Sequence, residues 1–111
     1  MSECIFCKIA KGEIPADFVY RDETVFVIRD ITPQAPAHFL VIPTRHVASA
    51  AEVADLAIWA AVMGRATEVA RSLGFTDGYR MVINTGVQSG QTVPHLHLHL
   101  LSGRVFGWPP G

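Results

Sequence analysis

The most regular alternation of polar and apolar residues in the chain lies in the segment HLHLHLL, residues 95–101. Successive side chains of a β-strand point to opposite faces of a sheet, so a strand here places its three histidines on one face. The alternating leucines then face the core, whereas the histidines face a polar site or water. Pro94 agrees with this prediction, because proline is tolerated at the first residue of a strand.

Four other segments are also predicted to be strands, because they are short and rich in β-branched, aromatic or other apolar residues. Asp22 and Glu23 form a tight hairpin between the first two strands, and Pro43 ends the third. A loop with two prolines, residues 30–36, separates the second strand from the third. The five predicted strands cover residues 18–21, 24–29, 38–42, 80–84 and 95–101.

One long helix is predicted from Ser49 to Leu73. Ser49 followed by Glu52 matches a capping box, in which each side chain accepts a hydrogen bond from the other residue's backbone amide. Gly74 supplies the C-terminal stop. Residues 56–63 are apolar nearly all round, which is typical of a helix that is buried on more than one side. Either the domain's own sheet or a dimer partner could cover this surface.

These elements predict an α+β fold: an antiparallel sheet of about five strands, one long helix, and one short helix at residues 4–11. A chain of 111 residues has the size of a single domain, here residues 1–111. The composition, 50% hydrophobic and 17% charged, is typical of a folded globule.

Charge and leader signals narrow the function classes. The formal net charge is −1 with no basic patch, which argues against nucleic-acid binding. The apolar runs are too short to cross a membrane, and the N-terminal residues lack the apolar region of a signal peptide. We therefore expect a cytoplasmic protein, whose two cysteines favour metal or thiol chemistry over a structural disulfide.

The histidine face has three possible explanations. It could be a solvated polar surface, although three of the five histidines in one short window make that unusual. It could be a catalytic metal site, since H-x-H on a strand can place two imidazoles on one zinc ion. It could also serve covalent catalysis, because a neutral imidazole is a nucleophile near pH 7 whose tautomer a backbone carbonyl can fix.

The loop that precedes the histidines favours a phosphate ligand. The segment NTGVQSGQTV, residues 84–93, offers glycine backbone amides and neutral hydrogen-bond donors. It contains no carboxylate, whereas a hydrolytic zinc site would usually need a nearby acidic general base. The loop is not a Walker motif, because it lacks G-K-[ST].

Several motifs together resemble the histidine-triad (HIT) superfamily, and its Hint branch in particular. The segment HLHLHLL fits the H-φ-H-φ-H-φ-φ motif, in which φ is apolar, and the similarity extends over essentially the whole chain. The supporting segments are CIFCKIAKGEIPA, DITPQAPAHFLVIPTRH, NTGVQSGQTVPHLHLHLLSGR and WPPG. The resemblance implies the HIT fold, with a sheet that extends across a homodimer. It also implies a nucleotide-binding hydrolase that cleaves purine nucleoside phosphoramidates.

The resemblance also implies roles for individual residues. His97, the middle triad residue, would attack the α-phosphorus and form a nucleotidyl-histidine intermediate. His99 would bind the phosphate oxygens, His38 would complete the relay, and the first triad residue, His95, would lie beside the nucleophile. The nucleotide would further contact Asp30 and Ile31 at the ribose and base, and Asn84, Gly90, Gln91 and Thr92 at the phosphate.

The C-terminal WPPG is an apolar end that could fold onto its own domain. The resemblance implies instead that Trp108 reaches the partner subunit and shapes its leaving-group pocket. The Fhit-like branch, which splits dinucleoside polyphosphates, lacks this ending. The uridylyltransferase branch has glutamine where His99 stands here. Both differences favour a Hint-type hydrolase.

Cys4 and Cys7 form a C-x-x-C motif that could be half of a zinc site, a redox pair, or two small core residues. Cysteine-containing members of the family bind zinc through this motif and two histidines. The resemblance therefore implies a structural zinc site made of Cys4, Cys7, His46 and His95. Other members lack the cysteines, so no metal would be required for catalysis.

The leading hypothesis is therefore a metal-independent nucleoside phosphoramidase that acts on AMP- or GMP-type compounds. A nucleotide-sensing interaction module, a dinucleoside polyphosphate hydrolase and a zinc hydrolase that uses the triad as ligands are the alternatives. Loss of a cellular role on His97 substitution would favour the enzyme over the module. Loss of activity on chelation would favour the zinc hydrolase.

Overall fold

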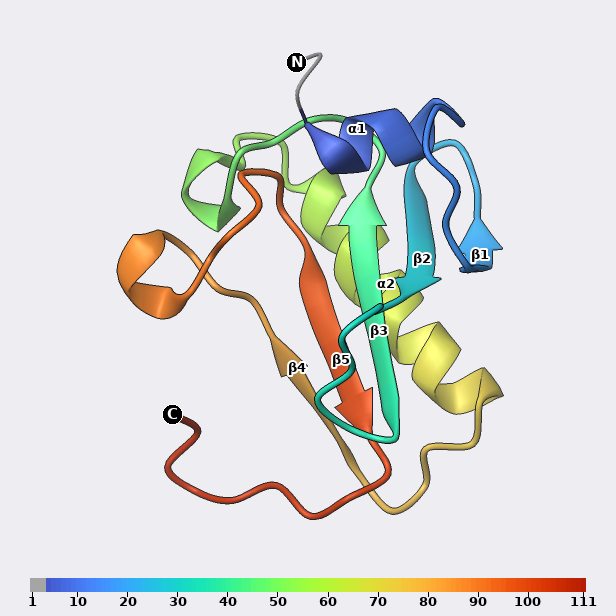
Figure 1. Ribbon diagram of the computed structural model, residues 1–111, viewed down its shortest axis with the longest axis vertical. Helices are drawn as coiled ribbons and strands as arrows, with labels where there is room; N and C mark the ends of the chain where they lie inside the picture. The colour runs from blue at the N-terminus through green and yellow to red at the C-terminus, as the bar shows by residue number, and fades with distance from the viewer. Residues whose placement is uncertain (1–3) are drawn as a thin grey trace.

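The computed structural model describes residues 4–111 and contains one antiparallel sheet with the strand order β1-β2-β3-β5-β4 (Figure 1). Two α-helices accompany the sheet, so the predicted α+β fold is confirmed. The strands are β1 (Phe18–Arg21), β2 (Val25–Arg29), β3 (Ala37–Pro43), β4 (Tyr79–Val82) and β5 (Leu98–Ser102). The helices are α1 (Ile5–Ala10) and α2 (Ala57–Ser72), with two short 3-10 turns, η1 (Ala50–Glu52) and η2 (Val87–Ser89).

Helix α2 covers one face of the sheet and lies behind it in the view of Figure 1. Val62 and Ala66 of this helix are fully buried against the strands. The leucines that alternate with the triad histidines pack into the same core, and none is more than 1% exposed. Burial of the leucines agrees with the predicted alternation. The leucines are Leu96, Leu98 and Leu100.

Helix α1 lies on the other face, across one end of β2 and β3 (Figure 1). Phe6 and Ile9 of α1 form a second apolar cluster with Phe26, Leu40 and Ile42 of these strands. The C-terminal tail leaves β5 at the opposite end of the sheet (Figure 1). The rings of His95 and His97 contact Phe6 of α1, and the ring of His99 lies against His38 of β3, which follows the loop that joins β2 to β3.

The predicted start of the long helix is wrong. Helix α2 begins at Ala57, and Ser49 instead caps the 3-10 turn η1, where its Oγ accepts a hydrogen bond from the backbone amide of Ala51 at 3.2 Å. The chain then becomes extended at Val53, which separates η1 from α2. Leu56 is the N-cap residue, and the carboxylate of Asp55, one residue earlier, accepts from the first helical amide, that of Ala57, at 3.0 Å. The predicted stop is confirmed, since Gly74 has a φ of +74° directly after the helix.

The regular part of the histidine strand is shorter than predicted. Pairing in β5 begins at Leu98, and His99 lies between Leu40 of β3 and Val82 of β4. His95 precedes the ladder in a bend, where its amide donates to the Val93 carbonyl at 2.8 Å. This bend turns the His95 side chain toward α1.

No helix in residues 4–111 combines the length and apolar character needed to cross a membrane.

Leu98→Ala should lower the free energy of unfolding by about 2–5 kcal/mol, because Leu98 is 0% exposed and its removal leaves a cavity between sheet and helix. Val87→Ala is the control, since Val87 is 90% exposed and its truncation should change stability by less than about 0.5 kcal/mol. Urea unfolding measures both. Equal effects of the two substitutions would contradict the packing described here.

Candidate active site and metal centre

His97 is held in one tautomer by the main chain. Its Nδ1 lies 2.8 Å from the carbonyl oxygen of His95, and a carbonyl can only accept, so Nδ1 carries the proton. In the neutral ring Nε2 then has a free lone pair. The ring is 7% exposed, and it forms a T-shaped pair with the ring of Phe6, with 5.2 Å between centroids. A neutral nitrogen with an unprotonated lone pair is the form that acts as a nucleophile.

A chain of hydrogen bonds also defines the tautomers of His38 and His99. The backbone amide of Gln34 donates to Nδ1 of His38 at 3.0 Å, so a neutral His38 carries its proton on Nε2. This Nε2 lies 2.9 Å from Nδ1 of His99 and 3.4 Å from a carboxylate oxygen of Asp30. Nδ1 of His99 therefore accepts, and a neutral His99 carries its proton on Nε2. The site thus presents an unprotonated His97 nitrogen beside an N–H donor on His99, with 5.0 Å between the ring centroids.

The surroundings keep these rings neutral at pH 7. Burial, with the nearby rings of His97 and His38, lowers the pKa of His99 to about 4. Burial also lowers the pKa of His38, against the opposing effect of the Asp30 carboxylate. Nδ1 accepts a hydrogen bond in both His38 and His99, so a second proton there would break that bond. The hydrogen bonds and the lowered pKa values therefore both favour neutral rings.

The loop residues predicted to line a phosphate lie on the segment that precedes the triad. Asn84 is half-buried, Thr92 is exposed, and Gly90 has a left-handed φ of +96° that favours glycine. The side-chain amide of Gln91 is already bonded within the protein: it accepts from the Gly86 amide at 2.9 Å and donates to the Ala48 carbonyl at 2.8 Å. Gln91 therefore fixes the loop, a role that the sequence did not indicate.

The residues predicted at the ribose and base lie on the loop between β2 and β3. One carboxylate oxygen of Asp30 lies 3.4 Å from Nε2 of His38, and the other accepts a hydrogen bond from the Thr32 amide at 2.8 Å. Ile31 is 97% exposed, as a side chain available to a ligand would be. Trp108, in the C-terminal tail, is 84% exposed.

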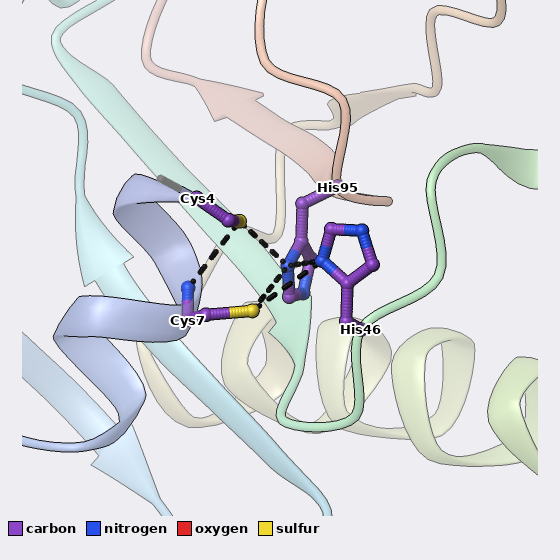
Figure 2. A group of neighbouring side chains, drawn as sticks. All are labelled: Cys4, Cys7, His46 and His95. Carbon is purple, nitrogen blue, oxygen red and sulfur yellow. Dashed lines mark hydrogen bonds between the residues drawn. The ribbon is translucent and has the colours of Figure 1, made fainter. Parts of the chain in front are cut away.

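Cys4, Cys7, His46 and His95 come together from three separate parts of the chain (Figure 2). The cysteines lie at the N-terminal end of α1, His46 follows β3, and His95 precedes β5. One ligand atom from each residue lies within 4.8 Å of every other. The side chains point toward a common centre, and both cysteines are buried thiols.

The distances between these atoms fit a tetrahedral metal site. Sγ of Cys4 lies 3.3 Å from Nδ1 of His95, and Sγ of Cys7 lies 3.3 Å from Nδ1 of His46. The two Nδ1 atoms are 3.2 Å apart. Zinc–sulfur bonds of about 2.3 Å and zinc–nitrogen bonds of about 2.0 Å place neighbouring ligand atoms about 3.3–3.8 Å apart in a tetrahedron. The four donor atoms therefore fit zinc in number, type and spacing.

The groups around the cluster prepare His95 as a ligand. Its Nε2 lies 2.8 Å from the Pro43 carbonyl and therefore donates to it, which leaves the lone pair of Nδ1 directed at the cysteines. Burial and the adjacent Cys4 thiol raise the pKa of the Cys7 thiol. A metal must displace that proton, so metal affinity is expected to fall as the pH falls.

A second group of possible ligands, Asp30, His38 and His99, lies in the active site, again within 4.8 Å. Hydrogen bonding accounts for this group. Because the Gln34 amide donates to one nitrogen of His38, the other carries the proton shared between His99 and Asp30. A protonated nitrogen has no lone pair for a metal, so the arrangement favours hydrogen bonding over the zinc-hydrolase alternative.

The lowered histidine pKa values predict a loss of stability in acid. The pKa of His99 is about 4 in the fold and about 6.5 when unfolded, so the unfolded chain binds more protons between these values. The contribution of the neutral His99 to the free energy of unfolding is therefore fully present above pH 6.5 and is lost as the pH falls toward 4. His99→Gln should reduce the slope of unfolding free energy against pH, by at most about 1.4 kcal/mol per pH unit before solvent screening. Urea unfolding in chelator, for both proteins, measures this slope; parallel slopes would contradict the burial of a neutral His99.

Comparison with known proteins agrees with these observations. The sequence model of the HIT domain matches residues 11–106. An uncharacterized HIT-like protein of Synechocystis is 49% identical, over 98% of this chain and 97% of its own length. A HIT family hydrolase from Legionella pneumophila has a TM-score of 0.95 at 47% identity, covering 98% of this chain and 100% of its own. A zinc-bound histidine triad family protein from Mycobacterium smegmatis has a TM-score of 0.85 at 34% identity, covering 93% and 76%. The chain belongs to the HIT family.

Proposed function

We propose that this protein is a nucleotide-binding hydrolase that cleaves the P–N bond of purine nucleoside 5′-phosphoramidates. The observation that carries the proposal is the 2.8 Å contact between Nδ1 of His97 and the His95 carbonyl, which leaves Nε2 of His97 as an available nucleophile. The similarity to the Legionella HIT family hydrolase supports hydrolysis as the reaction class.

In the proposed reaction, Nε2 of His97 attacks the α-phosphorus and a P–N bond forms as the substrate's P–N bond breaks. The departing amine takes a proton from solvent, and a nucleotidyl-histidine remains; the proton that water loses in the second step returns to solvent. Water then attacks the phosphorus, loses a proton, and releases the nucleoside monophosphate and free His97. Proton gain and loss balance over the two steps, so the protein needs to hold no extra proton at rest. This suits rings whose pKa values are lowered.

Neutral donors would stabilise the phosphoryl oxygens in this reaction. The Nε2–H of His99 is directed by its bond to His38, and the backbone amides of the glycine-containing loop offer further donors. A leaving group that becomes a neutral amine on protonation carries less negative charge than a polyphosphate, so it suits a site whose hydrogen-bond donors are neutral. The proposed nucleotide contacts are Asp30 and Ile31 at the ribose and base, and Asn84, Gly90, Gln91 and Thr92 at the phosphate.

We also propose that the protein is a homodimer whose sheets join. The sheet order leaves β4 at an edge, where unpaired backbone groups can pair with a second copy. Tyr79 of β4 is 39% exposed, and Leu56 and Met63 at α2 are 76% and 36% exposed. These apolar side chains support an interface along the helix and the edge strand. Trp108 would then reach the partner's leaving-group pocket.

We propose a structural zinc ion at Cys4, Cys7, His46 and His95. When bound, zinc would supply a fixed cross-link between α1, the segment after β3 and the segment before β5. The zinc-bound relative from Mycobacterium smegmatis and the tetrahedral spacing of the donor atoms support this assignment. Two buried cysteines that serve as metal ligands are typical of proteins in a reducing compartment, so we propose a cytoplasmic location.

Wild-type protein should release AMP from adenosine 5′-phosphoramidate, and His97→Ala should reduce kcat/KM by about 10³-fold or more, because the nucleophile is lost. Rapid quenching in alkali followed by mass spectrometry should detect the nucleotidyl adduct on wild type only. Retention of activity by His97→Ala, or strong inhibition of wild type by a zinc chelator while it remains folded, would contradict a metal-independent covalent mechanism.

Cys7→Ser should lose the bound zinc, because one of four ligands is replaced. Its free energy of unfolding in excess zinc should fall by about 2.7 kcal/mol or more, the contribution of a ligand at roughly 100 times its Kd. Elemental analysis and urea unfolding measure these changes. Zinc added after chelation should restore wild type but not the variant, and a Cys7→Ser protein with one zinc ion per chain would refute the ligand set.

A further inference from the structure

The turn that follows β5 is fixed against the loop between β2 and β3. Nε of Arg104 donates to the carbonyl of Gln34 at 3.1 Å, across 70 residues of sequence. Gly103 lies so close to this loop that a Cβ on it would be 2.8 Å from Cβ of Pro36. Gly103 also has a φ of +98°, which disfavours other residues. Two independent contacts therefore hold the turn and the loop together.

Gln34 connects this contact to the active site. Its carbonyl accepts from Arg104, and its own backbone amide donates to Nδ1 of His38 at 3.0 Å. His38 in turn lies 2.9 Å from Nδ1 of His99. The side chain of Gln34 donates to the Thr32 carbonyl at 3.0 Å, which holds the same loop in its turn. A continuous path of hydrogen bonds thus leads from Arg104 to His99.

The guanidinium of Arg104 is itself held in place. Its Cζ lies 4.3 Å from the centroid of the Phe106 ring, and its Nη1 donates to the Val105 carbonyl at 3.1 Å. Arg80 of β4 contacts the same tail, with Cζ 5.2 Å from the Phe106 ring and Nη2 donating to the Gly107 carbonyl at 2.7 Å. Within the described residues, 4–111, Arg104 contacts both the tail and the Gln34 loop, whereas Arg80 contacts only the tail. Replacing Arg80 therefore tests loss of the tail contact without loss of the loop contact.

We propose that Arg104 is a positioning residue that fixes the tautomer of His38, and through it that of His99. This inference rests on the proposed function, in which the Nε2–H of His99 binds the phosphoryl oxygens. Without the Arg104 bond, the Gln34 amide is no longer held toward His38. Only the Asp30 carboxylate, 3.4 Å from Nε2 of His38, then favours the Nε2 proton, so part of the His38 population can carry its proton on Nδ1. His99 would then carry its own proton on Nδ1 to donate to His38, and the donor on its Nε2 would be lost.

The test compares Arg104→Lys with Arg104→Met in the full-length protein. Lysine keeps the positive charge but has a methylene group where arginine has Nε, so both variants lack the donor. In ¹H–¹⁵N spectra of the imidazole rings, wild type should show a single His38 tautomer protonated on Nε2. Both variants should show a mixture of tautomers. With adenosine 5′-phosphoramidate, both should lower kcat by about 10- to 100-fold and leave KM nearly unchanged.

Arg80→Met is the matched control, because Arg80 contacts the tail but not the loop; it should keep the wild-type His38 spectrum. Arg71→Met, at an exposed position near the end of α2, controls for loss of surface charge. Wild-type spectra from both Arg104 variants would overturn the proposal. If only Arg104→Lys keeps the wild-type His38 spectrum, the positive charge and not the Nε donor is what matters. If Arg80→Met and Arg104→Met change the spectrum equally, the effect comes from the tail. Either result would also overturn the proposal.

The two readouts separate this inference from the proposed function. The tautomer spectra require no substrate, so they test the role of Arg104 even if wild type does not hydrolyse the phosphoramidate. A tautomer change without any wild-type turnover would refute the enzyme assignment and retain the positioning role. Should Arg104→Met not fold, Arg104→Lys provides the same spectroscopic test.

Discussion

The hydrogen bonds of His95 are the constraint on which both sites depend. This residue is 0% exposed, its Nε2 donates to the Pro43 carbonyl, and its Nδ1 faces the two cysteines. Its own carbonyl accepts from His97. One residue thereby joins α1, the end of β3 and the proposed nucleophile. The proposed metal ligands and the proposed nucleophile are therefore connected through the side chain and the carbonyl of one residue.

Neutral imidazoles make the proposed reaction physically reasonable. Burial lowers the pKa of His38, His95 and His99, so these rings act as directional donors and acceptors instead of cations. Main-chain groups orient three of the rings: the Gln34 amide holds His38, the Pro43 carbonyl holds His95, and the His95 carbonyl holds His97. Main-chain groups cannot rotate away as side chains can. Preorganised dipoles of this kind stabilise developing charge without reorganisation during the reaction. The same burial opposes protonation and makes the fold sensitive to acid.

The tail and the loop between β2 and β3 extend this organisation to the far end of β5. Gly103 permits a close approach to Pro36 that any larger residue would prevent, and Arg104 uses that approach to reach Gln34. The loop also carries Asp30, whose carboxylate lies 3.4 Å from His38. The contacts of Gly103 and Arg104 therefore help to position the loop that is proposed to bind the ribose. The C-terminal segment thus contributes more than the tail that bears Trp108.

The sequence by itself determined the elements that depend on local pattern. The alternation at residues 95–101 identified the buried leucines and the shared histidine face, and Gly74 marked the end of α2, because side-chain direction and glycine conformation are local properties. The start of α2 was mistaken, since a capping-box pattern at Ser49 competes with the better-placed carboxylate of Asp55. Only the tertiary structure decided the tautomers of the histidines, the binding of Gln91 within its loop, and the reach of Arg104 to Gln34. These depend on backbone carbonyls and amides brought together from distant segments. Every residue has the carbonyl and every residue except proline has the N–H, so the sequence has no signal for them.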